Sequence, residues 1–67
     1  MENLIKTRRT QMKLSQDNLA KKCKVSRQTI NAIENNKYDP TLSLAFSLAK
    51  VLEVTVDELF KNKNSAR

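Results

Sequence analysis

The sequence predicts an all-α fold of five short helices, and three observations carry this prediction. Apolar residues recur at helical spacing along nearly the whole chain, and no segment alternates apolar and polar residues as a strand does. Residue types that cap helix N-termini stand before four of the five segments. The 67 residues suffice for one small domain, near the lower limit of what folds without disulfides or metals.

The first three predicted helices span residues 3–13, about 16–23 and about 27–34. In the first, Ile5, Arg9 and Met12 follow the i, i+4, i+7 spacing of one helix face, although an Arg on an inward stripe is unexpected. Ser15 is placed to cap the second helix and Ser26 the third, because a Ser hydroxyl accepts a hydrogen bond from the first free amides. The three residues between the second and third helices form a tight break.

The last two predicted helices follow a turn and are separated by a break at residues 53–54. Thr41 caps the fourth helix, which carries the strongest apolar stripe of the chain: Leu44, Ala45, Leu48, Ala49 and Leu52. Thr55 and Glu58 have the spacing of a capping box, in which each side chain accepts from the other residue's backbone amide. The fifth helix is expected to finish at Phe60.

The composition excludes several classes of protein. With no His, no Gly and one Cys, the chain lacks the residues of serine–histidine catalysis, phosphate-binding loops and zinc sites, so we expect neither an enzyme nor a metal or cofactor. The apolar runs are too short to span a membrane, and the N-terminus has no signal-peptide pattern. Cys23 is expected to be a buried, inert thiol rather than a redox sensor, and a lone Cys fits a cytoplasmic protein.

The positive charge lies in the first half of the chain. Residues 1–38 hold nine basic and three acidic side chains, whereas residues 39–67 hold four of each, which accounts for the net charge of +6. Such a one-sided excess is typical of proteins that bind a polyanion. A solvated basic face is the alternative that charge alone leaves open.

The segment from Gln16 to Glu34, QDNLAKKCKVSRQTINAIE, predicts a helix-turn-helix motif. A three-residue break cannot lay two helices antiparallel, so they cross steeply. The outer face of the second of them carries Arg27, Gln28, Asn31 and Ala32, with Thr29 beside them. Arg and Gln pair with guanine and adenine edges, and Ala can approach a thymine methyl, so this face is suited to reading DNA. A merely solvated face, the alternative, more often carries Glu and Lys pairs.

Over residues 3–60 the chain resembles the Cro/repressor-type helix-turn-helix domain, which is lambda-repressor-like in fold and is also called the xenobiotic-response-element family. The resemblance rests on LSQ before the second helix, VSRQTI at the third, and IENNKY followed by Pro40 after it. It implies a stand-alone regulator, most often a repressor, that binds palindromic double-stranded DNA as a homodimer. We expect no membrane partner, because the basic half of the sequence lacks the apolar face that membrane-surface binding needs, and no small-molecule effector, because we find no effector domain.

The resemblance also implies roles for individual residues. Arg27, Gln28, Asn31 and Ala32 match positions that read bases, and those that match DNA backbone contacts are Gln16, Thr29, Asn35, Asn36, Lys37 and Tyr38. Gln16 could also bond to Arg27, and Tyr38 could instead cover the edge of the core. Arg9 and Glu34 match a partly buried ion pair; two unrelated surface charges are the alternative.

Two positions depart from the pattern of the family. Lys24 and Asn36 stand where many members have Gly, and a left-handed conformation would cost a Lys about 1 kcal/mol. Asn tolerates that conformation more easily.

Four apolar residues near the C-terminus, Val54, Val56, Leu59 and Phe60, exceed what one small core is expected to bury. We therefore expect a self-complementary dimer contact near residues 54–60, with pure core packing as the alternative. The polar residues 61–67 are expected to fray. A protein-binding role as an antitoxin or adaptor, and a restriction-modification controller or activator, remain alternative functions.

Overall fold

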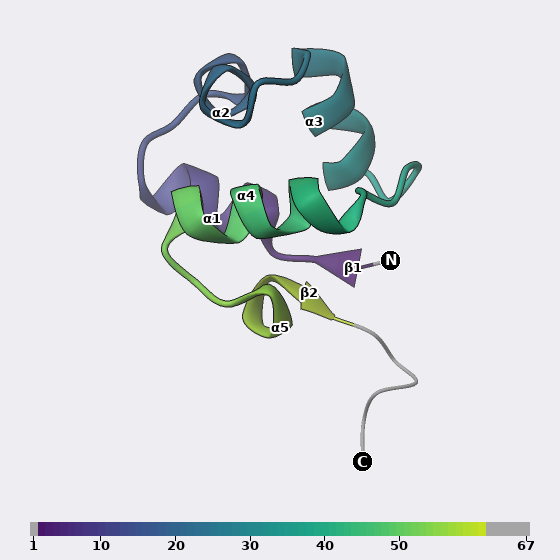
Figure 1. Ribbon diagram of the computed structural model, residues 1–67. Helices are drawn as coiled ribbons and strands as arrows, with labels where there is room; N and C mark the ends of the chain where they lie inside the picture. The colour runs from purple at the N-terminus through teal and green to yellow at the C-terminus, as the bar shows by residue number, and fades with distance from the viewer. Residues whose placement is uncertain (1, 62–67) are drawn as a thin grey trace.

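The computed structural model describes residues 2–61, which form five α-helices and one two-stranded antiparallel sheet (Figure 1). In chain order the elements are β1 (Glu2–Asn3), α1 (Ile5–Gln11), α2 (Gln16–Cys23), α3 (Arg27–Glu34), α4 (Leu42–Leu52), α5 (Val56–Leu59) and β2 (Phe60–Lys61). The all-α prediction of five helices is confirmed. The predicted fraying of residues 62–67 lies outside the described residues.

All four predicted N-caps are present. Each cap hydroxyl accepts a hydrogen bond from the backbone N–H three residues later: Ser15 from Asn18, Ser26 from Thr29, Thr41 from Leu44 and Thr55 from Glu58. The capping box is complete, because the Thr55 N–H donates to the Glu58 carboxylate at 2.9 Å. The hydrogen bonds between Thr55 and Glu58 lower the pKa of the Glu58 carboxyl. Their contribution to stability is therefore present at neutral pH and is lost as the carboxylate is protonated in acid.

Four turns that follow helices contain a left-handed residue without using glycine. Lys13, Lys24, Asn36 and Glu53 have φ between 60 and 62°. After α2, for example, the Lys24 N–H donates to the Lys21 carbonyl and the Val25 N–H to the Ala20 carbonyl, which is the Schellman arrangement. A left-handed conformation costs a residue with a Cβ about 1 kcal/mol, so these turns are strained at Lys13, Lys24 and Glu53 and less so at Asn36.

The core draws on every helix. Seven large side chains are fully buried: Ile5, Leu19, Ile30, Ile33, Leu48, Leu52 and Leu59. Cys23 is also buried, as expected, and burial raises the pKa of its thiol, so the thiol remains protonated at neutral pH. With α2 and α4 packed on one another and α1 behind α4, the core fixes α2 and α3 at the top of the molecule in Figure 1.

The ends of the described chain form a sheet that the sequence analysis did not predict. Asn3 pairs with Phe60 and Glu2 pairs with Lys61, and the Leu4 N–H donates to the Leu59 carbonyl at 2.8 Å. The first helix is predicted over residues 3–13, but in the structure it starts two residues later, at Ile5. Residues 12 and 13 belong to the turn that follows it. Phe60 lies in β2 rather than in the fifth helix, and Lys61 is paired rather than frayed. Strands of two residues are too short to show alternation.

The expectation that four apolar residues exceed the core is wrong for Leu59. Its side chain is 0% exposed, because α5 turns it inward against the core. Val54, Val56 and Phe60 pack against the core but remain partly exposed. Leu59 is therefore not available for a dimer contact, whereas the other three side chains are.

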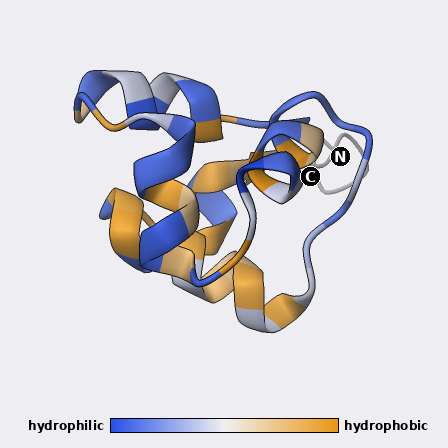
Figure 2. Cartoon of the chain, turned by 90° about the horizontal axis from the view of Figure 1, so that it is seen from above, coloured by the Kyte–Doolittle hydropathy of each residue, from blue (hydrophilic) through white to orange (hydrophobic). Residues whose placement is uncertain are grey.

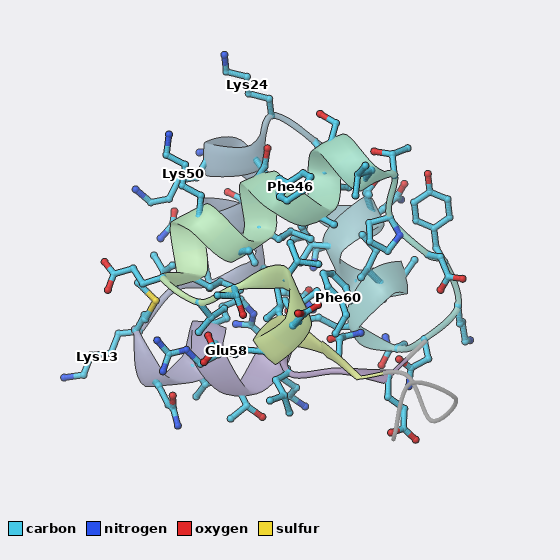
Figure 3. All side chains as sticks on the ribbon, turned by 60° about the horizontal axis from the view of Figure 1, so that its bottom comes forward. Lys13, Lys24, Phe46, Lys50, Glu58 and Phe60 are labelled. Carbon is cyan, nitrogen blue, oxygen red and sulfur yellow. The ribbon has the colours of Figure 1, made fainter. Side chains whose placement is uncertain are left out.

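The outer face of α4 carries two large apolar side chains outside the core. Leu42 is 69% exposed and Phe46, one turn later, is 58% exposed. Figure 2 shows α4 mostly in hydrophobic colours although one side of it faces solvent, and Figure 3 shows Phe46 and Phe60 on one side of the molecule. No helix within residues 2–61 is long and apolar enough to cross a membrane.

Replacing the left-handed Lys24 tests the strain in these turns. Lys24→Gly should stabilise the protein by about 0.5–1 kcal/mol, since relief of the left-handed strain exceeds the added entropy of the unfolded chain. Lys22→Gly, at an exposed position within α2, is the matched control and should destabilise by about 1 kcal/mol. Urea denaturation measures both, and equal destabilisation by the two variants would contradict the expectation.

Candidate nucleic-acid interface

The helices α2 and α3 form the predicted helix-turn-helix. Figure 1 shows α2 end-on while α3 runs down the page, so the two helices cross steeply. The left-handed Lys24 reverses the chain, and the three-residue connection ends at the Ser26 cap. On the inner face of α3, Ile30 and Ile33 are buried, which leaves its opposite face to solvent.

The outer face of α3 presents polar side chains, and two of them, Arg27 and Gln28, have no partner within residues 2–61. Arg27, Gln28 and Asn31 are exposed, and Thr29 and Ala32 are half-buried. Within residues 2–61 no hydrogen bond or ion pair holds the side chains of Arg27 and Gln28. The Thr29 hydroxyl lies 3.0 Å from the Ser26 hydroxyl, which turns it toward the helix start. Two long donors at the first turn of α3 are thus free to meet a partner in front of the helix.

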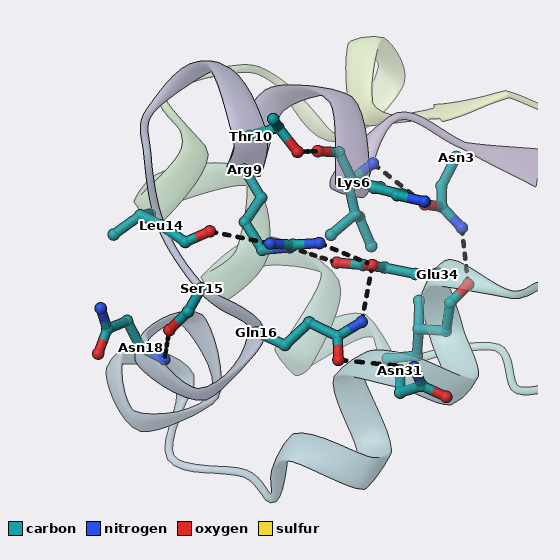
Figure 4. A network of polar contacts seen from close by, with 12 residues as sticks. Asn3, Lys6, Arg9, Thr10, Leu14, Ser15, Gln16, Asn18, Asn31 and Glu34 are labelled. Atoms are coloured by element: carbon teal, nitrogen blue, oxygen red, sulfur yellow. Dashed lines mark hydrogen bonds and ion pairs between the residues drawn. The ribbon is translucent and has the colours of Figure 1, made fainter.

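Gln16, the first residue of α2, lies between α3 and α1. Its Nε2 donates to Glu34 Oε1 at 3.0 Å, and its Oε1 accepts from Asn31 Nδ2 at 3.5 Å (Figure 4). The expectation that it bonds to Arg27 is therefore wrong. Only Gln16 Oε1 could accept from the Arg27 guanidinium, and in the structure this oxygen lies beside Asn31 Nδ2 instead.

The loop after α3 is hydrophilic and exposed, as Figure 2 shows in blue. Asn35 Nδ2 folds back onto the Asn31 carbonyl and side chain at 3.0 and 3.2 Å. Asn36 takes the left-handed conformation expected for it. The Lys37 N–H donates to the Ala32 carbonyl, and its side chain is exposed. Tyr38 is 48% exposed.

The pair predicted to tie the first helix to the third is present as a close contact. Arg9 Nε donates to Glu34 Oε2 at 2.7 Å and its Nη2 donates to Oε1 at 3.3 Å. The side chains are 13% and 3% exposed. Arg9 Nη1 also donates to the Leu14 carbonyl at 2.9 Å. The unexpected Arg on the inward stripe is explained, because it neutralises a buried carboxylate.

Asn3 is a second anchor for α3, and the sequence analysis missed it. Its Nδ2 donates to the Ile33 carbonyl at 2.8 Å and to Asn36 Oδ1 at 3.3 Å, while its Oδ1 accepts from the Ile5 N–H. The bond from the Ile5 N–H to Asn3 Oδ1 forms an Asx turn, and Asn before a helix is a local signal for such a turn that could have been noticed. Its contact with the end of α3 leaves no local signal in the sequence.

The basic side chains divide into two groups. Arg8 and Arg9 are half-buried and serve the fold, since Arg8 Nη2 donates to the Leu52 carbonyl that ends α4. The exposed group of the first half is Lys6, Lys13, Lys21, Lys22, Lys24, Arg27 and Lys37. Of these, Lys21 lies 3.5 Å from the Asp17 carboxylate on the same helix. Lys21, Lys22, Lys24, Arg27 and Lys37 lie on α2, on α3 or in the segments next to them, so exposed cations flank the motif.

The chain is similar to known helix-turn-helix proteins. A helix-turn-helix family model matches residues 5–59. An uncharacterized HTH-type transcriptional regulator of Methanocaldococcus jannaschii is 52% identical over 60 residues, covering 90% of this chain and 91% of that protein. The N-terminal DNA-binding domain of SinR from Bacillus subtilis is 29% identical with a TM-score of 0.78, covering 91% of this chain and 90% of that chain. The SinR–SinI complex is also similar, at 28% identity and TM-score 0.79, covering 94% and 62%.

A double-mutant cycle tests the Arg9–Glu34 pair. Arg9→Met should destabilise the protein by about 3 kcal/mol, because it leaves a buried carboxylate without its counter-charge, and Glu34→Met should do likewise to Arg9. The double variant should be more stable than either single variant, since two apolar side chains need no compensation. Urea denaturation of the four proteins gives the coupling, and strictly additive losses would contradict it.

Proposed function

The chain belongs to the Cro/repressor-type helix-turn-helix family of transcriptional regulators, and from that membership we propose that it is a repressor that binds a palindromic operator as a homodimer. It would act in the cytoplasm, without catalysis, by occupying a promoter that polymerase needs. Its activity would then follow its own concentration and its dimerisation rather than a small-molecule effector.

The observation that carries this proposal is the outer face of α3. Arg27 and Gln28 are exposed, unpartnered within residues 2–61, and placed at the N-terminal turn of the second motif helix. In helix-turn-helix proteins that turn meets the base edges in the major groove. Arg pairs with guanine and Gln with adenine, Asn31 has the same chemistry as Gln28, and Ala32 leaves room for a thymine methyl.

Backbone contacts would come from both sides of α3. Gln16 and Thr29 lie at the helix starts, and the exposed loop after α3 contributes Asn35, Asn36, Lys37 and Tyr38. Such side chains and backbone amides hold the phosphates and fix the register of the protein on the duplex. The exposed lysines around α2 and α3 add attraction that does not depend on sequence.

We expect the second half of the described chain to form the contact with a second copy of the protein. Residues 39–61 hold four acidic and two basic side chains, so two copies meeting there avoid the repulsion between their basic halves. The contact would combine the outer face of α4, Leu42 and Phe46, with Val54, Val56 and Phe60. A two-fold axis there would present two α3 helices to successive major grooves roughly 34 Å apart.

Protein binding, as an antitoxin or adaptor, is the second candidate function. The exposed Leu42 and Phe46 favour it, because large apolar side chains on a helix surface often meet a partner. SinR, a structural relative, is known in complex with SinI. A chain that is monomeric and selects no DNA sequence would support this candidate over the repressor.

Selection from randomised duplexes at about 0.15 M salt tests the proposal. We expect a palindromic consensus bound at least about 10³-fold more tightly than scrambled DNA. Arg27→Ala should lose about 1–3 kcal/mol of discrimination at one base pair of each half-site, because it removes a bidentate contact. A variant that keeps the full consensus would show that α3 does not read bases through Arg27.

Lys37→Ala is the matched control, since it removes a cation from the same interface without touching α3. It should weaken binding to all sequences alike and lower the slope of log K against log salt by about one. An altered consensus in this variant would contradict the assignment of Lys37 to the DNA backbone.

The dimer contact is tested at Phe46, whose exposed side chain adds little to the monomer. Phe46→Asp should convert the dimer to a monomer in sedimentation equilibrium while the stability at low concentration changes by less than about 0.5 kcal/mol. Thr7→Asp, at an exposed position of α1, should stay dimeric. Persistence of the dimer in Phe46→Asp would exclude the outer face of α4 from the contact.

A further inference from the structure

The buried carboxylate of Glu34 accepts hydrogen bonds from Gln16 as well as from Arg9. It accepts hydrogen bonds from Arg9 Nε, Arg9 Nη2 and Gln16 Nε2, at 2.7, 3.3 and 3.0 Å (Figure 4). Its side chain is 3% exposed, so water does not compete for these sites. The carboxylate is thus held in place by Arg9 and offers one of its oxygens to α2.

This contact fixes which way the Gln16 amide points. A carboxylate can only accept hydrogen bonds, so the NH₂ end of Gln16 must face Glu34 and the Oε1 end must face away. In the structure Oε1 lies 3.5 Å from Asn31 Nδ2, at the long end of a hydrogen bond. The orientation that Glu34 imposes on the Gln16 amide therefore places an acceptor, Oε1, beside the Asn31 side chain on the outer face of α3.

A second contact orients Asn31 from its other end. Asn35 Nδ2 donates to Asn31 Oδ1 at 3.2 Å. Donor and acceptor at opposite ends of the Asn31 amide agree on one orientation, with the nitrogen toward Gln16 and the oxygen toward Asn35. Each end keeps a further site, since the amide nitrogen carries two N–H groups and the oxygen has two lone pairs.

We propose that Glu34, acting through Gln16, holds the Asn31 amide in one orientation and thereby makes Asn31 select adenine. This inference rests on the proposed reading of DNA by α3. The remaining N–H and lone pair of Asn31 match N7 and N6–H₂ of adenine, whereas guanine presents two acceptors to the same amide. Glu34 and Gln16 are positioning residues, because they act on the base through Asn31.

Holding the amide before DNA arrives lowers the entropy lost on binding. A free Asn side chain on a helix surface would sample both amide orientations and would have to be ordered by the base itself. The oriented amide can form both hydrogen bonds only with a base that presents its donor and its acceptor at the corresponding positions. The ion pair that stabilises the fold therefore also sharpens the choice of base.

Gln16→Met tests the proposal in the full-length chain. It keeps the length of the side chain and the Arg9–Glu34 pair but removes both polar ends. The position read by Asn31 is defined as the one whose preference disappears in Asn31→Ala. At that base pair Gln16→Met should lose discrimination by about fivefold or more, while preferences at the other positions stay as in the wild type.

Two comparisons make the result decisive. Loss of the Gln16 phosphate contact alone would weaken binding to every sequence equally, and that outcome would overturn the proposal. Gln11→Met, at an exposed glutamine of α1 outside this network, is the matched control and should leave all preferences unchanged.

A measurement without DNA separates this inference from the proposed function. Side-chain ¹⁵N relaxation should find the Asn31 amide as ordered as the backbone in the wild type and mobile in Gln16→Met. The exposed Asn18 amide, whose side chain makes no hydrogen bond within residues 2–61, supplies the mobile reference. If the Asn31 amide of the wild type moved as freely as that of Asn18, the orientation would not exist. A failed DNA selection with an ordered Asn31 would instead reject only the reading of DNA.

Discussion

The Arg9–Glu34 ion pair is the contact on which the placement of α3 depends, because it joins the first helix to the last turn of the third inside the protein. Each charge is almost fully removed from water, so either one alone would destabilise the fold by several kcal/mol. Packings that separate the two side chains are disfavoured for that reason. The pair thus selects one position of α3. No internal disulfide could do this instead, because the chain has a single Cys, the buried Cys23.

Most of the fold could be predicted because its signals are local. The four N-caps and the capping box depend on residues no more than three positions apart, and the structure contains all of them. The buried stripe of α4 follows from helical period alone. Left-handed geometry at Lys24 and Asn36 could be expected because many members of the family have Gly at these positions, whereas the same geometry at Lys13 and Glu53 was not predicted. Each of these features is decided before distant parts of the chain meet.

The features that could not be predicted join residues far apart in the sequence. Pairing of Asn3 with Phe60, its bond to the Ile33 carbonyl and the contact of Gln16 with Glu34 depend on tertiary packing. Burial of Leu59 likewise depends on how α5 turns against the core. The roles of Arg27 and its neighbours in DNA binding stay predictions, since they depend on a duplex that the fold itself does not determine.

The pairing of β1 with β2 has a consequence for the order in which the protein folds and opens. It joins residues 2–3 to residues 60–61, and the entropy lost in closing so long a loop is compensated only after the helices have packed. We therefore expect the ladder to form late in folding and to open early in local fluctuations. Because Asn3 lies in this ladder and binds the Ile33 carbonyl, each opening also frees that carbonyl, while the Arg9–Glu34 pair still holds the last turn of α3. The last turn of α3 is thus held by the Arg9–Glu34 pair and, through Asn3, by the pairing of residues 2–3 with residues 60–61.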